Sequence, residues 1–346
     1  MKISVVTSLV LVALSLITIF GFVEPSSNFT KNKMYTNEFQ TVVFLSKENA
    51  SIYLSDDEYF VRTNDYFDIS IRLEEDLSIK SREENKKALK DFSITQTMNW
   101  EEKEISRVYS IIENAQKNIS KKTPSVLQDT LFLIKTSGKE NFDAYYTAKK
   151  AIVIPKTELK FLWITPRKRD VMGTYVHEYM HIFTRLNTAK RNELYKIIGF
   201  EILNDFKLPN TLENRRITNP DFLDLNFGIK LKDSLGNSEF YTLLLTSKYD
   251  KYDGKKGLAS YLNTLLGYAD VSLYRINENG EVLDNPLPFS EEFLKKVGTI
   301  STYRYGADEI IAEAFQVMIT ENIESNSEYS ERDKQIITEL QAELKK

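Results

Sequence analysis

Cysteine is absent from this chain of 346 residues, and histidine is nearly so, because His177 and His181 are the only two. The lack of cysteine excludes a disulfide framework, a thiolate nucleophile, thiolate ligands for zinc and a lipid-modified cysteine after an export signal. A metal site in this chain would therefore have to use His, Asp, Glu or Tyr side chains.

The chain also lacks a glycine-rich phosphate loop, an internal repeat and a dense run of basic residues. Its net charge is −4, and its Lys and Arg residues are scattered along the sequence. A nucleic-acid-binding face needs clustered cations to displace counterions from the phosphates, so we expect no nucleic-acid partner. The length is sufficient for one large or two small domains with a hydrophobic core.

Residues 1–24 are predicted to be a signal peptide or an N-terminal membrane anchor. An uncharged run extends from Ile3 to Val23, between Lys2 and Glu24. The run is long enough to cross a bilayer and no Ala-x-Ala cleavage site follows it, which favours the anchor slightly. The flanking charges favour translocation of the remainder, so we expect an extracytoplasmic protein, either membrane-attached through residues 3–23 or secreted.

Two regions are expected after this segment. Residues 25–125 are polar and mostly helical in pattern, and we interpret them as an α-rich scaffold or spacer without chemistry of its own. Residues 126–346 alternate strand and helix patterns, which predicts an α+β domain. In it, strands are expected at 130–136, within 144–154, at 240–246 and at 269–276, and helices at 165–187, 189–203, 307–321 and 331–344.

The strongest motif is His177-Glu178-Tyr179-Met180-His181. On a helix, a spacing of four places both imidazoles on one face, where both can reach a tetrahedral zinc ion about 2 Å away. Glu178 is turned by about 100° from His177, so it can take a proton from a metal-activated water as that water attacks a carbonyl. Apolar residues on the remaining faces, and the placement of both histidines in the motif, favour a zinc site over an ordinary histidine pair.

The third ligand has to be a carboxylate, and the residue pattern leaves two candidates. Glu201 lies in the second predicted helix with Asp205 four residues later, which resembles the Glu-x-x-x-Asp arrangement of thermolysin-like enzymes. Glu309 lies on a predicted helix near the C-terminus, where Glu313 shares its face and the small Ala312 would allow close packing on another helix.

One segment resembles a known family of zinc peptidases. The sequence DEIIAEAFQVM (308–318), after STYRYG (301–306), is similar to the corresponding part of the anthrax lethal factor catalytic domain and the related Pro-Pro endopeptidases. The resemblance implies that Glu309 is the third zinc ligand and that Glu313 orients a ligand or the base. It also implies a catalytic tyrosine a few residues upstream of Glu309.

The upstream tyrosine is out of register with this family. Family spacing falls on Thr302, with Tyr303 and Tyr305 on either side. Either hydroxyl could stabilise the oxyanion of the tetrahedral intermediate, and we take Tyr303 as the catalytic residue. The two motifs are also much further apart than in the family, so residues of about 205–300 are expected to form an inserted subdomain.

A second resemblance covers HEYMHIFTRLNTAKRNELYKIIGFEI (177–202) and RRITNPD (215–221). These segments are similar to an uncharacterised group of bacterial secreted HExxH proteins with a carboxylate-bearing helix near the C-terminus. That group does not depend on a glutamate at the position of Glu201, which again favours Glu309.

Two further segments have a functional and a structural interpretation. Residues 144–154 could be the edge strand with which an extended peptide pairs, or simply a core strand. Arg215-Arg216 with Asn219-Pro220-Asp221 could place an arginine in the cleft for a substrate carboxylate or carbonyl, or could form a surface loop held by Asx turns.

The sequence thus predicts an extracytoplasmic gluzincin-type metallopeptidase with an α+β, zincin-like fold that acts on a peptide or protein. One Zn²⁺ would be held by His177, His181 and Glu309, with Glu178 as general base and Tyr303 assisting. Two alternatives remain. One is a catalytically idle, membrane-tethered binding domain, against which the retained Glu178 argues; the other is a zinc hydrolase of a non-peptide amide.

Overall fold

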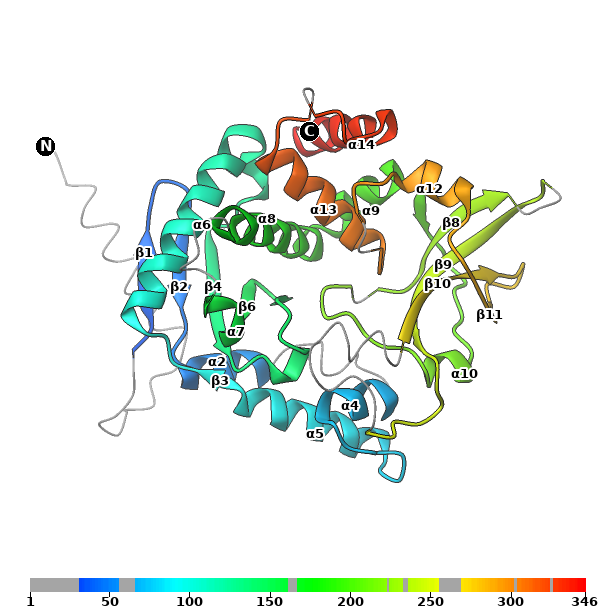
Figure 1. The fold of residues 1–346 in the computed structure, drawn as a ribbon, viewed down its shortest axis with the longest axis horizontal. Coiled ribbons are helices and arrows are strands. Elements are labelled where there is room, and N and C mark those ends of the chain that lie inside the picture. The colour runs from blue at the N-terminus through cyan, green and yellow to red at the C-terminus, as the bar shows by residue number, and fades with distance from the viewer. Residues whose placement is uncertain are drawn as a thin grey trace, which may run out of the picture. The chain divides into compact units, whose positions relative to one another are not determined.

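The computed structural model describes residues 31–55, 66–160, 167–222, 224–232, 236–254, 269–301, 304–323 and 326–346. The apolar run of residues 3–23 and the expected helix start at Thr165-Pro166 lie outside them. None of the helices within the described ranges is long and apolar enough to cross a membrane. Residues from Asn32 onward form one compact unit of two sheets with helices around and between them (Figure 1).

The first sheet is mixed and has the strand order β1-β2-β4-β6-β5, with β3 also paired to β4. Strands β2, β4 and β6 run parallel, whereas β1, β3 and β5 are antiparallel to their partners. Their bounds are β1 (Lys33–Thr36), β2 (Thr41–Phe44), β3 (Thr97–Met98), β4 (Thr130–Thr136), β5 (Tyr146–Ala148) and β6 (Ala151–Pro155).

Helices cover both faces of this sheet, which explains the almost continuous apolar sequence of its central strands. Leu131 and Leu133 of β4 join the core with α6 and α8, whereas Ile134 of β4 and Val153 of β6 join the core with α2, α4 and α5. These helices are α2 (Lys47–Ser55), α4 (Tyr66–Leu73), α5 (Arg82–Thr95), α6 (Glu102–Lys122) and α8 (Arg167–Leu186); the short α7 (Lys156–Leu159) follows β6.

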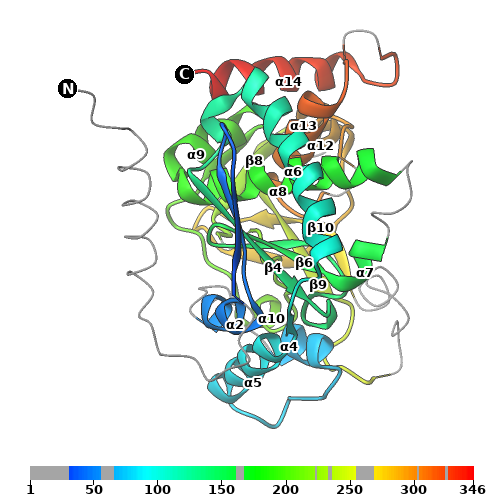
Figure 2. The same ribbon diagram turned by 90° about the vertical axis from the view of Figure 1, so that its left-hand side faces the viewer.

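The second sheet is antiparallel throughout, with the order β11-β10-β9-β8-β7. It lies across α8 from the first sheet, and Figure 2 shows the same arrangement with the first sheet toward the viewer. Its strands are β7 (Phe200–Ile202), β8 (Phe227–Lys232), β9 (Ser238–Ser247), β10 (Ala269–Ile276) and β11 (Val282–Leu287), accompanied by α9 (Thr188–Ile197), α10 (Asn210–Glu213) and α12 (Glu291–Val297).

Helix α13 (Ala307–Thr320) packs along α8, and α14 (Glu331–Leu344) packs against α13. Small side chains allow α8 and α13 to approach closely: a Cβ added at Gly173 would lie 3.0 Å from Nε2 of Gln316, and Ala312 is fully buried. This approach places α8, which carries His177 and His181, against α13, which carries Glu309.

The strands predicted at 130–136 and 269–276 and the two C-terminal helices are confirmed. The expected helix at 189–203 is wrong in its second half, because α9 ends at Ile197 and residues 200–202 form β7. Gly199 adopts a φ of +84°, a left-handed conformation that ends helices and that other residues adopt at a cost. Residues 33–44, expected to be part of a mostly helical region, form β1 and β2 instead.

An ion pair buried between β4 and α6 ties the sheet to the helix layer. Both carboxylate oxygens of Glu104 accept hydrogen bonds from Nζ of Lys135, at 2.8 and 2.7 Å, and the lysine side chain is 2% exposed. A buried charge that loses its partner is strongly destabilising, because neither water nor a counter-charge then solvates it.

Lys135→Met should therefore lower the free energy of unfolding by about 3 kcal/mol. Urea unfolding followed by circular dichroism measures this value. The double variant E104L/K135M should recover most of the loss, since it leaves no buried charge. Lys87→Met, at the exposed pair with Asp91, is the matched control and should change stability little. An equal effect at both lysines would contradict this interpretation.

Candidate metal centre

The two histidines of α8 face one another on one side of the helix. Nε2 of His177 lies 2.9 Å from Nε2 of His181, and both rings are mostly buried, with side-chain exposures of 13% and 1%. Two imidazole nitrogens at this distance have to share a proton or a cation, because two lone pairs would repel each other. The four-residue spacing in the sequence is thus realised as a converging pair of donors.

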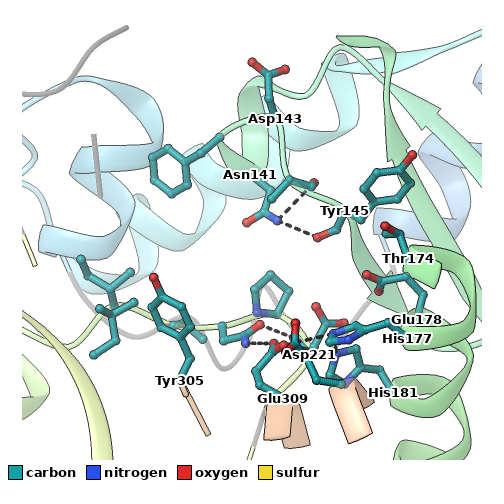
Figure 3. A pocket seen from close by; sticks show the side chains of 18 of the residues that line it. Asn141, Asp143, Tyr145, Thr174, His177, Glu178, His181, Asp221, Tyr305 and Glu309 are labelled. Carbon is teal, nitrogen blue, oxygen red and sulfur yellow. Dashed lines mark hydrogen bonds and ion pairs between the residues drawn. The ribbon is translucent and has the colours of Figure 1, made fainter. Parts of the chain in front are cut away.

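Glu309, in the first turn of α13, supplies a third donor to the same point. Its Oε2 lies 3.1 Å from Nε2 of His177, and its Oε1 lies 3.8 Å from Nε2 of His181. Ligands about 2.0 Å from a tetrahedral zinc ion are roughly 3.3 Å from one another. The three side chains therefore fit a zinc ion without rearrangement of the backbone (Figure 3).

The charges in this group hold one another in their ionised forms. Burial tends to raise the pKa of Glu309, but His181 and His177 lower it below its ordinary value. Burial tends to lower the pKa of His181, but the carboxylates of Asp221 and Glu309 raise it to about 10. The surroundings therefore stabilise a positive charge between the carboxylates, which a proton or a metal cation can supply.

Side chains behind the donors restrict how they can turn. Nδ2 of Asn219 donates a hydrogen bond of 2.6 Å to Oε1 of Glu309. An outer partner of this kind sets the orientation of a ligating carboxylate. On the other side, a carboxylate oxygen of the buried Asp308 lies 3.9 Å from Nδ1 of His181, which is too far for a hydrogen bond.

Glu178 points into the same cleft but is not one of these three donors. It is 4% exposed, and its Oε2 has no hydrogen-bond partner among the described residues. Burial, and next the negative charge of Asp221, raises its pKa well above the usual value. Ligand atoms of Glu178, His181 and Asp221 lie within 4.8 Å of one another. A carboxylate in this environment binds a proton more readily than an ordinary glutamate does.

The cleft above this group has a volume of about 360 Å³. Figure 3 shows Glu178 beside the histidines and Tyr305 and Asn141 on the facing sides. The half-buried Glu313 also belongs to its lining, and burial raises the pKa of its carboxyl. The other lining residues come from α4, α7, α8, β9 and α13 and from the loops 141–145 and 217–221: Arg72, Phe142, Asp143, Ala144, Tyr145, Glu158, Thr174, Ile217, Thr218, Asn219, Pro220, Asp221, Leu245 and Gln316.

The described residues contain one of the two candidate tyrosines. Tyr303, the preferred catalytic tyrosine, lies outside them. Tyr305 lines the cleft, and burial together with the charge of Glu309 raises the pKa of its phenol. The hydroxyl of Tyr305 is therefore protonated at neutral pH.

Glu201 lies on β7, where it is exposed and pairs with Gly228 of β8. It belongs to neither group of potential metal ligands within the described residues. The thermolysin-like arrangement required Glu201 to lie on a helix facing α8, and the early end of α9 removes that helix.

The structure also bears on the two segments that had both a functional and a structural interpretation, residues 144–154 and residues 215–221. Strand β6 is internal, so within residues 144–154 the sheet edge is β5 alone, and the amide of its Thr147 already donates to Oδ1 of Asp221 at 2.7 Å. Neither Arg215, paired with Asp284 at 2.6 Å, nor the buried Arg216 lines the cleft.

Sequence reasoning thus identified His177, His181, Glu309 and Glu178, which the structure brings together. It missed the contact of Asn219 with Glu309, the position of Asp308 and the cleft arginine, Arg72. The turn-forming composition of residues 219–221 gave a weak signal, but nothing in the sequence linked Arg72 to the motif.

No family model, no curated protein and no solved structure matches this chain. The resemblance of residues 301–318 to lethal factor-like peptidases is therefore still a prediction.

Glu309→Ala should abolish tight zinc binding, because only two protein donors would remain. The loss should exceed the about 10- to 100-fold weakening typical of a missing outer partner. Zinc affinity is measured by competition with a chromophoric chelator on the purified chain. Glu201→Ala is the matched control and should bind one zinc per chain with unchanged affinity; weaker binding by Glu201→Ala alone would reverse the assignment.

Proposed function

We propose that this chain is a zinc-dependent metallopeptidase with a zincin-like fold. The observation that supports it best is the convergence of His177, His181 and Glu309 on one point of a cleft, with Glu178 beside them. Two histidines and one glutamate are the donor set of hydrolytic zinc sites, which keep their fourth position open for water or substrate.

The residues around this point have complementary roles. A bound zinc ion would polarise the scissile carbonyl and lower the pKa of a nearby water. The carboxylate of Glu178 takes a proton from the attacking water and delivers it to the leaving nitrogen. Its raised pKa suits both steps, since the group has to accept the proton and then release it.

Tyr305 is the candidate for stabilising the negative charge that develops on the carbonyl oxygen. It lines the same cleft as His177 and Glu178, and its phenol is protonated at neutral pH. A hydroxyl donor aimed at the developing oxyanion is worth most in a cleft that excludes water.

We take an extended peptide as the substrate, and the segment Ala144–Tyr145 lines the cleft directly before the sheet edge β5. The amide of Ala144 donates to the carbonyl of Asn141 at 2.9 Å, and Nδ2 of Asn141 donates to the carbonyls of Ala144 and Tyr145 at 3.5 Å. The amide of Thr147 donates to Asp221, so a substrate strand would have to replace existing hydrogen bonds along this edge. Attachment through residues 3–23 and an extracytoplasmic location belong to the same proposal.

The geometry of the cleft argues against one of the two alternatives and does not distinguish the other from a peptidase. An idle binding domain has no need of a buried carboxylate oxygen without a hydrogen-bond partner, and Oε2 of Glu178 is such an atom within the described residues. Hydrolysis of a non-peptide amide would use the same donors and the same base, so substrate trials have to include such amides.

Glu178→Gln should keep zinc binding but lower turnover by about 10²- to 10⁴-fold, because the amide cannot accept the proton of water. Hydrolysis of a set of fluorogenic peptides and amides, together with zinc titration, measures both quantities. Glu201→Gln, at an exposed glutamate, is the control. Undiminished turnover in Glu178→Gln would exclude the proposed mechanism.

Tyr305→Phe should lower kcat by about 10²-fold with little change in KM, since the lost hydroxyl acts mainly on the developing oxyanion. Steady-state kinetics on the best substrate separate the two constants. Tyr249→Phe, at an exposed tyrosine, should behave as wild type. An unchanged kcat in Tyr305→Phe would show that this hydroxyl does not act in the reaction.

A further inference from the structure

Arg72 is a buried cation in the wall of the cleft. It lies on α4, in the region for which the sequence indicated no chemistry, and it is 4% exposed. Its Nε donates to Oδ1 of Asp68, one helical turn earlier, at 2.9 Å, and the Asp68 side chain is fully buried as well. This pair makes the burial of the guanidinium tolerable and orients its outer nitrogens.

The two outer nitrogens of Arg72 reach two different walls of the cleft. Nη1 donates to Oδ1 of Asn141 at 2.7 Å and to the carbonyl of Glu140 at 3.3 Å, both in the loop before β5. Nη2 donates to the carbonyl of Thr218 at 2.7 Å, in the segment after α10. A planar guanidinium can hold both walls at once, whereas the single ammonium group of lysine cannot.

The segment held by Arg72 continues directly to the metal centre. Asn219 follows Thr218, and its Nδ2 donates to Oε1 of Glu309 at 2.6 Å. The Oδ1 of Asn219 accepts from the amide of Asp221 at 2.9 Å, so the side-chain amide is turned with its NH₂ group toward Glu309. Before Thr218, the amide of Ile217 donates to the carbonyl of Leu245 at 2.8 Å, which anchors the segment to β9.

We infer that Arg72 is a positioning residue of the metal centre, which acts through the Thr218 carbonyl and Asn219 on the carboxylate of Glu309. Helix α4 then belongs to the functional unit and is not a spacer. The guanidinium directs its donors to Asp68, Asn141 and Thr218 and is almost inaccessible, so it holds the walls together instead of binding substrate. This inference rests on the proposed zinc site.

The test compares zinc dissociation constants of full-length variants, measured by chelator competition. Arg72→Lys keeps the charge beside Asp68 but cannot also hold Thr218, and it should weaken zinc binding about 10-fold. Asn219→Ala should weaken it by a similar factor. In the double variant R72K/N219A the two losses should not multiply, because both substitutions break the same connection to Glu309.

Arg82→Lys is the matched control. Arg82 also joins the N-terminal region to a distant segment, through a contact of 3.2 Å with Glu213, but this pair is partly exposed, whereas the pair of Arg72 and Asp68 is buried. Zinc affinity should be unchanged in Arg82→Lys. If Arg72→Lys does not fold, D68N/R72Q, which removes both buried charges, replaces it and should weaken zinc binding to the same extent.

The outcomes separate this inference from the proposed function. Wild-type zinc affinity in Arg72→Lys or D68N/R72Q would overturn it, and so would multiplying losses in R72K/N219A, which would mean that Arg72 acts independently of Asn219. Absence of zinc binding by the wild-type chain would instead overturn the proposed zinc site itself.

Discussion

The close packing of α13 on α8 is the contact on which the rest of the cleft depends. His177 and His181 occupy the facing side of α8, and Glu309 lies in the first turn of α13. The absence of a side chain at Gly173 lets α13 approach α8 to contact distance. Without this approach the three donors would not reach a common point, and Glu178 would have no cleft in which to act.

The buried carboxyl groups around this contact favour a cation bound among them. Glu178, Asp308 and Glu309 are almost inaccessible, and Asp221 lies beside the first of them. Buried carboxylates without enough positive charge or hydrogen bonds are costly. A zinc ion held by His177, His181 and Glu309 would offset this cost, and an excess of buried acid of this kind is common at functional sites.

Local sequence patterns predicted several of the main helices and strands well. The apolar run of β4 and the helical periodicity of α13 and α14 agree with the structure. The expected helix through Glu201 is wrong beyond Ile197, because Gly199 takes a left-handed backbone conformation that ends α9. Strands β1 and β2 were missed because four-residue strands gain their stability from the sheet they join, and not from their own composition.

The sequence alone determined that His177, Glu178 and His181 share a helix, because the spacing of donors within one helix is set by local geometry. The absence of cysteine and of further histidines also determined that any third protein ligand is an oxygen donor. Only the tertiary structure decided that Glu309 faces these histidines, that Asn219 donates to its carboxylate and that Arg72 of α4 donates to the carbonyl of Thr218, the residue before Asn219. These contacts join segments far apart in the chain, and their free energy comes from the packing of whole elements.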